Sequence, residues 1–432
     1  MQKKQCFVIP AKGGITLVIK RRLSSLRFVL NNIAQIITSK GYSIIIFCFL
    51  LVNTSFAQKN TFKTGRPTTK DYYTKISYKN IRGKLIVPVV INNKTYRFLF
   101  DTGAPNLISS ALASQISKNK STTISVSDAN QKEQRMQRTT IPLITIGEVT
   151  FKNTSALVFD KTSNLLFDCY AIDGIIGSNL LRKSVVQILP KEGIIILTNN
   201  PKKLQLNKRK SIDLTLEGNQ SSPYINIRLK AHKNASEKVL MDTGASGFYD
   251  MCKKNYHILE QNNIVAPFAT GTGAASIGLL GTSEEQKQYL VKVPALEIAG
   301  HSFKNVSTIT SSDSNSRIGS DILKYGAITI NFRDKQFYFE TYNSENDLTE
   351  KHFGFTPTIK NNKLIVGVVW DDTLKNKISS GDEILKVNDN YISELNICDL
   401  ITKDSPFKIN TTINITVRIK TGNVISLALE KH

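Results

Sequence analysis

The sequence from about residue 81 to residue 345 is written twice, and this internal repeat constrains the fold more than any other feature. Asp101-Thr102-Gly103-Ala104 in the first copy corresponds to Asp242-Thr243-Gly244-Ala245 in the second, and three apolar residues precede each Asp. Ile175-Ile176-Gly177 corresponds to Arg317-Ile318-Gly319. Gly177 lies 76 positions after Asp101, and Gly319 lies 77 positions after Asp242. The matched spacing predicts two copies of one structural unit.

The repeated unit is β in character. Residues 86–91, 224–229, 328–330 and 337–339 are short runs rich in β-branched and aromatic residues. Turn-forming pairs such as Asn92-Asn93 and Arg333-Asp334 separate such runs. Long helical periodicity is absent, so the sequence predicts an all-β, bilobal architecture. We expect an N-terminal linker (58–80), a first lobe (81–200), a basic interlobe linker (201–212) and a second lobe (213–345).

The two Asp-Thr-Gly-Ala segments are candidates for paired carboxylates. The apolar residues before Asp101 and Asp242 predict that each Asp ends a buried strand, and the following Gly permits a tight turn. Two buried carboxylates brought together share one proton, because both cannot ionise cheaply. One can then act as a base towards water while the other protonates a carbonyl oxygen. The alternative is that each Asp only caps a turn, but the duplication favours a functional pair.

These residues resemble the aspartic peptidases of the pepsin and retroviral-protease type, and more closely the bacterial retropepsin-like family. The resemblance covers residues 81–345 and implies hydrolysis of peptide bonds, with no cofactor and no metal. It implies that Thr102 and Thr243 brace the two loops against each other. Loop support would come from Ile175, Ile176 and Gly177 in the first copy and from Ile318 and Gly319 in the second, where Arg317 departs from the family's apolar residue. One chain carries both loops, so a dimer is not required.

The same resemblance suggests flaps, which are hairpins that close over the substrate. In the second lobe the glycine-rich stretch 271–281 is the candidate, with Gly271, Gly273 and Gly278 supplying mobility. A dinucleotide-binding loop is the alternative, but Ser276 stands where that motif needs its third Gly. The corresponding stretch of the first lobe, 128–138, is polar and lacks Gly. We expect it to be a poorer flap or only a solvated loop.

The repeat stops near residue 350, and residues 350–432 resemble a small PDZ-like β/α domain. Gly381-Asp382-Glu383-Ile384 matches that family's turn into a strand, and Phe353-Gly354-Phe355 matches its carboxylate-binding loop. Such domains bind a chain terminus by adding it as a strand to a sheet. A C-terminal peptide is therefore one expected partner. The alternative is a β domain that only packs against the lobes.

The N-terminal residues 1–57 have the parts of a secretory signal peptide. Lys40 precedes the apolar run 43–52, and the small-residue site Ser55-Phe56-Ala57 follows it. This predicts export to a bacterial periplasm, cell surface or medium, or a membrane anchor if the segment is not cleaved. Removing residues 1–57 takes away eight Lys and Arg and no acidic residue, so the formal charge falls from +23 to +15.

The remaining charge is compatible with membrane association but does not require it. The Lys residues are scattered, and the densest cluster, 202–210, lies in the interlobe linker, so we expect no nucleic-acid binding. Three cysteines follow the signal region, Cys169, Cys252 and Cys398, which allows at most one disulfide. The chain has only five His and lacks a zinc-binding pattern of Cys and His, which argues against a metal site.

The sequence therefore predicts an exported aspartic endopeptidase whose Asp101 and Asp242 activate water to cleave a peptide or protein substrate. Two alternatives belong to other classes. One is a non-catalytic peptide-binding protein with a retropepsin-like fold, and the other is a scaffold in which the PDZ-like domain carries the function. The Asp present in both loops argues against the first alternative, because a binding protein needs neither.

Overall fold

The computed structural model describes residues 9–10, 16–17, 62–116, 122–160, 164–231 and 233–432. Apart from β1 (Ile9–Pro10) and β2 (Thr16–Leu17), the segment expected to be a signal peptide lies outside the described residues. Within the described part of the chain, no helix is both long and apolar enough to cross a membrane.

The molecule is mostly β, as the sequence predicts, and its helices are short. The strands up to residue 200 are β3 (Arg66–Pro67), β4 (Tyr73–Ser77), β5 (Lys79–Ile81), β6 (Lys84–Ile91), β7 (Lys94–Asp101), β8 (Leu107–Ser109), β9 (Thr122–Ser127), β10 (Glu133–Ile146), β11 (Val149–Phe159), β12 (Gly174–Gly177), β13 (Val185–Leu189) and β14 (Ile194–Thr198). The strands between residues 211 and 347 are β15 (Ser211–Glu217), β16 (Ser222–Lys230), β17 (Asn234–Met241), β18 (Tyr249–Asp250), β19 (Pro267–Gly273), β20 (Ile277–Gly278), β21 (Gly281–Thr282), β22 (Gln286–Ile298), β23 (His301–Ile309), β24 (Arg317–Ile318), β25 (Gly326–Asn331), β26 (Gln336–Thr341) and β27 (Glu345–Asp347).

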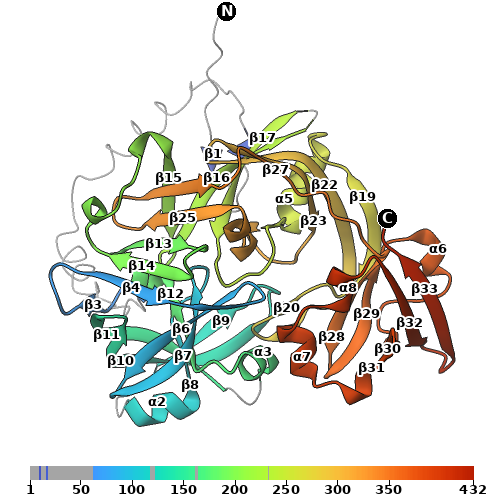
Figure 1. The fold of residues 1–432 in the computed structure, drawn as a ribbon, viewed down its shortest axis with the longest axis horizontal. Coiled ribbons are helices and arrows are strands. Elements are labelled where there is room, and N and C mark those ends of the chain that lie inside the picture. The colour runs from blue at the N-terminus through green and yellow to red at the C-terminus, as the bar shows by residue number, and fades with distance from the viewer. Residues whose placement is uncertain (1–8, 11–15, 18–61, 117–121, 161–163, 232) are drawn as a thin grey trace, which may run out of the picture.

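Residues 350–432, which we call the C-terminal module, form a third region. Its strands are β28 (Phe355–Lys360), β29 (Lys363–Val369), β30 (Glu383–Val387), β31 (Asn390–Tyr391), β32 (Thr412–Arg418) and β33 (Val424–Glu430). The described α-helices are α2 (Ser110–Ile116), α3 (Leu165–Cys169), α4 (Ser178–Leu181), α5 (Lys253–Gln261), α6 (Asp372–Lys375), α7 (Ile397–Thr402) and α8 (Pro406–Ile409). The 3₁₀ helices are η2 (Pro201–Lys203), η3 (Lys208–Lys210), η4 (Ser320–Lys324) and η5 (Ile392–Glu394). In Figure 1 the C-terminal module is the orange and red region on the right.

The hairpin of β6 and β7 illustrates how local sequence builds the strands. Asn92 and Asn93 connect the two strands with φ of +48° and +60°, the left-handed conformation that Asn tolerates in tight hairpin turns. β6 also pairs with β5 through its first residues and with β10 through Val89 and Val90. Pro88 lies between these two pairings, where a missing N–H costs little. The hairpin therefore ends β7 at a fixed position, Asp101.

The same strand arrangement occurs behind both Asp residues. β12 runs parallel to β7 and pairs Ile175 with Leu99, two residues before Asp101. β24 runs parallel to β17 and pairs Arg317 with Leu240, two residues before Asp242. Each Asp therefore lies at the end of a buried strand or directly after it, and a second strand runs beside that strand.

A central sheet joins the two lobes. Its strand order is β4, β14, β13, β25, β26 and β15, and the strands β13 and β25 meet in antiparallel register from Val185 to Ile188. The expected N-terminal linker, 58–80, thus includes the strand β4 of this sheet. The expected interlobe linker, 201–212, contains η2, η3 and the start of β15. Figure 1 places this sheet on the left, between the lower and upper lobes.

The C-terminal module shares hydrophobic core with the first lobe. Leu157 and Phe167 of that lobe belong to the same buried cluster as Phe355, Val366 and Ile415 of the module. A disulfide between Cys169 and Cys398 joins α3 to α7, which accounts for one bridge among the three cysteines, and Cys252 is free and buried. The module is therefore tied to the first lobe by both packing and a covalent bond.

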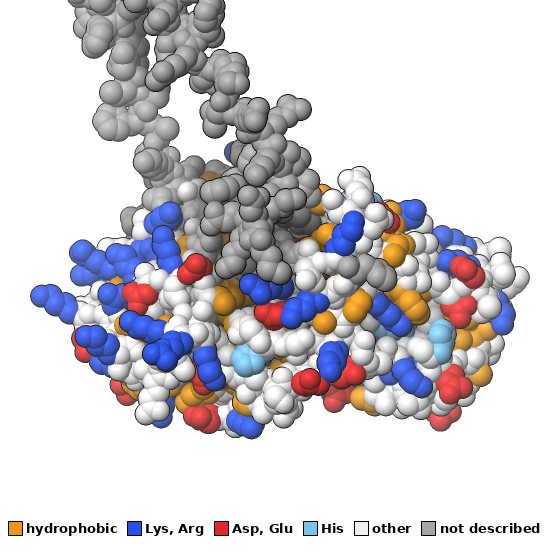
Figure 2. All heavy atoms as spheres, turned by 90° about the horizontal axis from the view of Figure 1, so that it is seen from above, with side chains coloured by type: hydrophobic (Ala, Val, Ile, Leu, Met, Phe, Trp, Pro, Cys, Tyr) orange, Lys and Arg blue, Asp and Glu red, His pale blue; other side chains and the backbone are white. Residues whose placement is uncertain are grey.

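The surface carries the excess of positive charge without a single basic stripe on the face shown. In Figure 2, Lys and Arg side chains are interspersed with Asp and Glu across the view. The interlobe cluster predicted from the sequence lies on η2 and η3, where Lys203 forms an ion pair with Asp71 at 2.6 Å.

Candidate active site

The two Asp-Thr-Gly-Ala loops meet face to face. Thr102 Oγ1 donates to the carbonyl of Met241 at 2.6 Å, and Thr243 Oγ1 donates to the carbonyl of Phe100 at 2.9 Å. Each Thr hydroxyl also accepts the backbone N–H of the other Thr, both at 3.1 Å. Both Thr side chains are fully buried. This reciprocal network fixes one loop against the other and is the contact that the family resemblance implies for Thr102 and Thr243.

Glycine is needed where each loop passes the opposite carboxyl group. A Cβ on Gly103 would lie 2.5 to 2.7 Å from the carboxyl atoms of Asp242. A Cβ on Gly244 would overlap the carboxyl group of Asp101. The close approach of each loop to the other carboxyl group explains why both tetrapeptides have Gly at the third position. The two carboxyl groups are thus brought together, with exposed fractions of 9% for Asp101 and 5% for Asp242.

Backbone N–H groups orient both carboxyl groups in the same way. Oδ1 of Asp101 accepts from Gly103 N at 2.8 Å and from Ala104 N at 3.0 Å. Oδ1 of Asp242 accepts from Gly244 N at 2.9 Å and from Ala245 N at 3.1 Å. Donors of this kind favour the ionised form of a carboxyl group. They leave the second oxygen of each group for other partners.

The support elements predicted from the sequence lie behind their loops. Ile175, Ile176 and Gly177 form most of β12 and are buried. Ser178 N donates to the carbonyl of Ala104 at 3.0 Å, and Ser320 N donates to the carbonyl of Ala245 at 2.9 Å. A Cβ on Gly319 would lie 2.6 Å from the carbonyl oxygen of Gly247, so this Gly is also required by packing. Ile318 is fully buried.

Two cations near the pair were not identified as site residues from the sequence. Arg317 Nη1 donates to Oδ2 of Asp242 at 2.9 Å, and these side chains are 11% and 8% exposed. Lys84, at the start of β6, donates to the carbonyl of Gly244. Burial lowers the pKa of Lys84, while Asp242 and Asp101 act to raise it. Arg317 could have been identified from the sequence, because it stands where the family has an apolar residue. No sequence feature pointed to Lys84.

The protonation of Asp101 is strongly perturbed. Burial and then the neighbouring Asp242 raise the pKa of Asp101 to about 7, against the opposing effects of the Gly103 N–H and the Lys84 ammonium. A carboxyl group with this pKa is largely protonated in mildly acidic solution and can donate a proton there. Asp101 is therefore suited to act as an acid.

Asp101 and Asp242 line one cavity of about 1730 Å³ whose two sides differ. The first lobe contributes mainly apolar side chains: Ile86, Leu99, Leu107, Leu157, Phe167 and Ile175. The second lobe contributes mainly polar and charged side chains: Ser246, Asp250, Ser311, Asp313, Asn315 and Arg317. An extended peptide crossing the pair would meet both surfaces.

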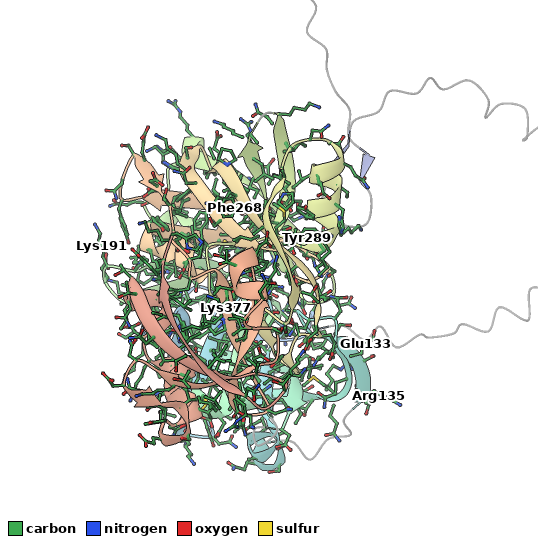
Figure 3. All side chains as sticks on the ribbon, turned by 90° about the vertical axis from the view of Figure 1, so that its right-hand side faces the viewer. Glu133, Arg135, Lys191, Phe268, Tyr289 and Lys377 are labelled. Carbon is green, nitrogen blue, oxygen red and sulfur yellow. A yellow bond between two sulfur atoms is a disulfide. The ribbon has the colours of Figure 1, made fainter. Side chains whose placement is uncertain are left out.

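The hairpin of β9 and β10, which we expected to be a poorer flap or a solvated loop, lines this cavity. β9 and β10 form a hairpin, and its residues 124–131 line the cavity. Asp128 closes the hairpin turn by accepting the N–H groups of Asn130 and Lys132 at its Oδ1. A Gly-free hairpin is stable here because the Asp128 side chain satisfies the turn. Figure 3 labels Glu133 and Arg135 on the exposed opposite arm of this hairpin.

The predicted flap of the second lobe divides into two parts. Gly278 lines the cavity, and a Cβ there would lie 2.6 Å from Oδ2 of Asp128. Gly271 and Gly273 lie in β19 instead and face the C-terminal module, where Gly273 pairs with Val368 of β29. These two glycines permit close packing of β19 on β29, a physical role different from the hinge that we expected. Figure 3 labels Phe268, which belongs to β19, and Tyr289, which belongs to the neighbouring β22.

The turn of the β9–β10 hairpin contacts residues 276–281 of the second lobe. Leu280 N donates to Oδ2 of Asp128 at 2.9 Å. Asn130 Nδ2 donates to the carbonyl of Gly281 at 2.9 Å, and Ser276 Oγ donates to Oδ1 of Asn130 at 2.7 Å.

The segment Phe353-Gly354-Phe355, our candidate carboxylate-binding loop, leads into β28, whose first residue is Phe355. Gly354 has a φ of +51°, and its carbonyl accepts from Trp370 N and Asp371 N. Phe353 and Phe355 are buried, and the ring of Phe407 from α8 packs edge-on against both, with centroid distances of 6.5 and 5.7 Å. Residues 356–359 of β28, and residues 399–401 and 403–410 around α7 and α8, line the same cavity as Asp101 and Asp242.

Among the described residues, no group of three or more His, Cys, Asp or Glu side chains is arranged to hold a metal ion.

In the comparison with known proteins, one family model matches part of the chain. Residues 87–180 match the family model described as aspartyl protease. The match includes Asp101 and Ile175-Ile176-Gly177 and ends before the second lobe. It supports an aspartyl protease. No curated protein matches the chain.

Solved structures that resemble the chain are distant. A retropepsin-like aspartic protease from Rickettsia conorii is 19% identical, with a TM-score of 0.22, covering 31% of this chain and 94% of its own. The aspartic proteinase from Irpex lacteus is 13% identical, with a TM-score of 0.38, covering 63% of this chain and 98% of its own. Conglutin gamma from lupine seeds is 12% identical, with a TM-score of 0.37, covering 64% and 96%.

Proposed function

We propose that the chain is an aspartic endopeptidase in which Asp101 and Asp242 form the catalytic pair. One observation carries this proposal: two loops of identical sequence, one from each lobe, bring two buried carboxyl groups together inside one large cavity. The aspartyl protease family match over residues 87–180 supports it independently. On this proposal, the two lobes are copies of one unit, with the boundaries that the sequence predicts.

The chemistry follows from a shared proton. Two carboxyl groups in close contact inside the protein favour the singly protonated state, because a second negative charge is costly there. The ionised member removes a proton from a bound water, and the protonated member gives its proton to the carbonyl oxygen of the scissile peptide bond. No covalent intermediate and no metal is part of this scheme.

The cavity supports an extended peptide as substrate. Its apolar first-lobe side favours apolar side chains of the substrate through burial, at about 25 cal/mol per Å² of apolar surface removed from water. The lid hairpin of β9 and β10 would cover the bound chain and exclude water around the scissile bond.

For the C-terminal module we propose recognition of the C-terminus of a substrate or partner, as a PDZ-like domain would do. The order of its elements and the shared cavity wall formed by residues 356–359 support this role. The test is binding of peptides to the inactive D101N variant by calorimetry. A peptide with a free C-terminal carboxylate should bind, and the same peptide with a C-terminal amide should bind at least tenfold more weakly. Equal binding of both would oppose carboxylate recognition.

We also propose that the chain is exported and that the signal region is removed. The basic flank, apolar run and small-residue site before residue 58 support this. N-terminal sequencing of the protein recovered from cells should give a start near Gln58. A start that retains the apolar run would instead indicate a membrane anchor.

The function itself is tested by incubating the mature protein with a defined mixture of peptides and identifying the products by mass spectrometry. The D101N/D242N double variant is the matched control, because Asn preserves size and removes both carboxyl groups. Cleavage by the wild type alone supports an aspartic peptidase. Peptide binding by both proteins without any cleavage would favour the non-catalytic binding protein instead.

A further inference from the structure

The two Asp residues differ in the side chain that lies beside them. In the first lobe, Ile175 occupies the position that pairs with Leu99, and it is apolar and buried. In the second lobe, Arg317 occupies the corresponding position opposite Leu240. Its guanidinium group donates to Asp242 Oδ2 at 2.9 Å, inside the protein. The residue that differs between the two copies is therefore in direct contact with the proposed catalytic pair.

Several charged groups surround Arg317. Its Nη2 forms an ion pair with Asp313, and its Nε lies 3.9 Å from Oδ2 of Asp250. Lys84 from β6 adds a second cation close to the pair and interacts with both Asp101 and Asp242. The other titratable groups around this cluster are Tyr224 from β16, Asp321 from η4 and Lys324, which is paired with Asp321 at 2.8 Å.

Asp101 has the same backbone hydrogen bonds as Asp242, but among the described residues no Arg or Lys side chain forms an ion pair with it. Its Oδ1 accepts backbone N–H groups, and the nearby Lys84 ammonium donates to the carbonyl of Gly244. Asp101 thus has a cation in its neighbourhood, whereas Asp242 has a guanidinium group in direct hydrogen-bond contact. An opposite charge in contact favours the ionised form of a carboxyl group, and proximity makes this effect larger for Asp242.

We propose that Arg317 is a positioning residue that keeps Asp242 ionised and leaves the shared proton on Asp101, so that Asp242 is the base and Asp101 the acid. This inference rests on the proposed function and assigns the two roles within it. The raised pKa of Asp101, about 7, agrees with a proton held on that side of the pair. The tetrapeptides alone cannot make this assignment, because they are identical.

The assigned roles balance through both steps of hydrolysis. Asp242 takes a proton from water as the water oxygen bonds to the peptide carbonyl carbon, and Asp101 gives its proton to the carbonyl oxygen. In the resulting diol, Asp101 recovers a proton from one hydroxyl group as the carbonyl re-forms. The C–N bond then breaks, and the leaving nitrogen receives the proton held by Asp242. The pair returns to its starting state.

A purely structural role is the competing explanation. Arg317 bridges Asp242, Asp250 and Asp313, and so it also ties residues 311–317 to the loop of Asp242. Loss of that bridge alone would lower kcat by similar factors at every pH. Loss of the charge effect would instead move the pH profile, and the two explanations separate on that readout.

The experiment is the pH profile of kcat/KM for R317M/D313N, R317K and D313N. The double variant removes the guanidinium group without leaving Asp313 buried and unpaired, and D313N is its matched control. Without the cation both limbs of the bell-shaped profile should move towards alkaline pH by about one unit or more, since an opposite charge within about 4–6 Å typically has an effect of 1–3 units. R317K should keep both limbs near their wild-type positions.

Limbs that stay at their wild-type positions in folded R317M/D313N would overturn the proposal, and so would a move towards acid. A shift of the same size in D313N alone would assign the effect to Asp313 and overturn it as well. Carbon-13 NMR of aspartate-labelled protein gives a second readout without turnover. The carboxyl group that titrates at about 7 should be absent from D101N spectra. A wild type that cleaves no peptide would contradict the proposed function, whereas an active wild type with an unmoved profile contradicts only the role of Arg317.

Discussion

The two Asp-Thr-Gly-Ala loops have the same sequence and nearly the same backbone contacts, yet their carboxyl groups lie in different electrostatic environments. Both loops use the Thr hydroxyl, the Gly and the two backbone N–H groups in the same way. The difference arises at one position outside the tetrapeptide, which is Ile175 behind the first loop and Arg317 behind the second. Geometry is therefore set by the repeated residues, and charge is set by a supporting strand.

This comparison separates two kinds of requirement. Residues that hold the loops together occur in both copies, because each loop must fit the other. The residue that divides the chemistry between the two carboxyl groups occurs in only one copy. Changes in the shared residues should disturb both loops alike, whereas a change at Arg317 alters the direct contacts of Asp242 alone.

Substitution of the facing glycines should have the largest effect. In G103A the new Cβ would collide with Asp242, and in G244A it would collide with Asp101. Each variant should lose at least about 100-fold in kcat/KM, because a misplacement of about 1 Å in a catalytic group has a cost of that order. Both variants should also lower the free energy of unfolding, because each new Cβ displaces a buried carboxyl group. Peptide hydrolysis and urea unfolding give the two comparisons, and an active G244A enzyme would contradict the loop geometry.

Loss of either bracing Thr should destabilise the fold to a similar extent. T102V and T243V each remove a buried hydroxyl that donates to one carbonyl and accepts one N–H. Each variant should lower the free energy of unfolding by about 1–3 kcal/mol, because it leaves buried polar groups unpaired. The T102V/T243V double variant should cost less than the sum of the two, since the hydroxyls belong to one network. Strictly additive losses would argue against a shared network.

The raised pKa of Asp101 predicts a pH-dependent gain in stability for D101N. An unfolded Asp ionises near pH 3.9, whereas native Asp101 holds its proton up to about pH 7. Between these values the native state binds more protons than the unfolded state, so the stability of the wild type falls as pH rises. Asn cannot ionise, so D101N should gain stability relative to wild type over this window and keep the gain above it. Urea unfolding at several pH values measures the difference; a constant difference would exclude a raised pKa.

The smallest effect is expected from the residue after each Gly. Ala104 and Ala245 lack a hydroxyl, and a Ser there could donate to the adjacent carboxylate and favour its ionised form. In A104S/A245S the bell-shaped profile of kcat/KM should move towards acid by less than about one pH unit, less than the opposite shift expected from loss of the Arg317 charge. Thermal unfolding controls for an unpaired buried hydroxyl. A move towards alkaline pH in a folded variant would show that the hydroxyl does not donate to the pair.

Most of the site could be predicted from the sequence because it depends on local repeats. The duplicated tetrapeptides located Asp101 and Asp242, and the matched spacing located β12 and β24 behind them. A mostly β molecule followed from short β-branched runs with turn residues between them. In each case the signal is a short motif, and for the site it is a motif that occurs twice at matching positions.

The contacts named below join distant segments and could not be predicted from the sequence. Lys84 is one Lys among many until the fold brings it beside Gly244. The hairpin of β9 and β10 lines the cavity without a Gly in its turn, because the Asp128 side chain closes that turn. We expected Gly271 and Gly273 to form a hinge, but in the structure they allow β19 to pack closely on β29. The pairing of Cys169 with Cys398 depends on the docking of the C-terminal module, which no local pattern reports.

The central claim is that Asp101 and Asp242 act as one catalytic pair, and the activities of D101N and D242N measured side by side test it most directly. Each single variant should lose about 10²–10⁴-fold in kcat/KM on the same peptide, because one loses the acid and the other the base. Circular dichroism and urea unfolding should find both variants folded. If either folded variant kept more than about a tenth of the wild-type activity, that Asp could not hold such a role, and the pair would not be the catalytic unit.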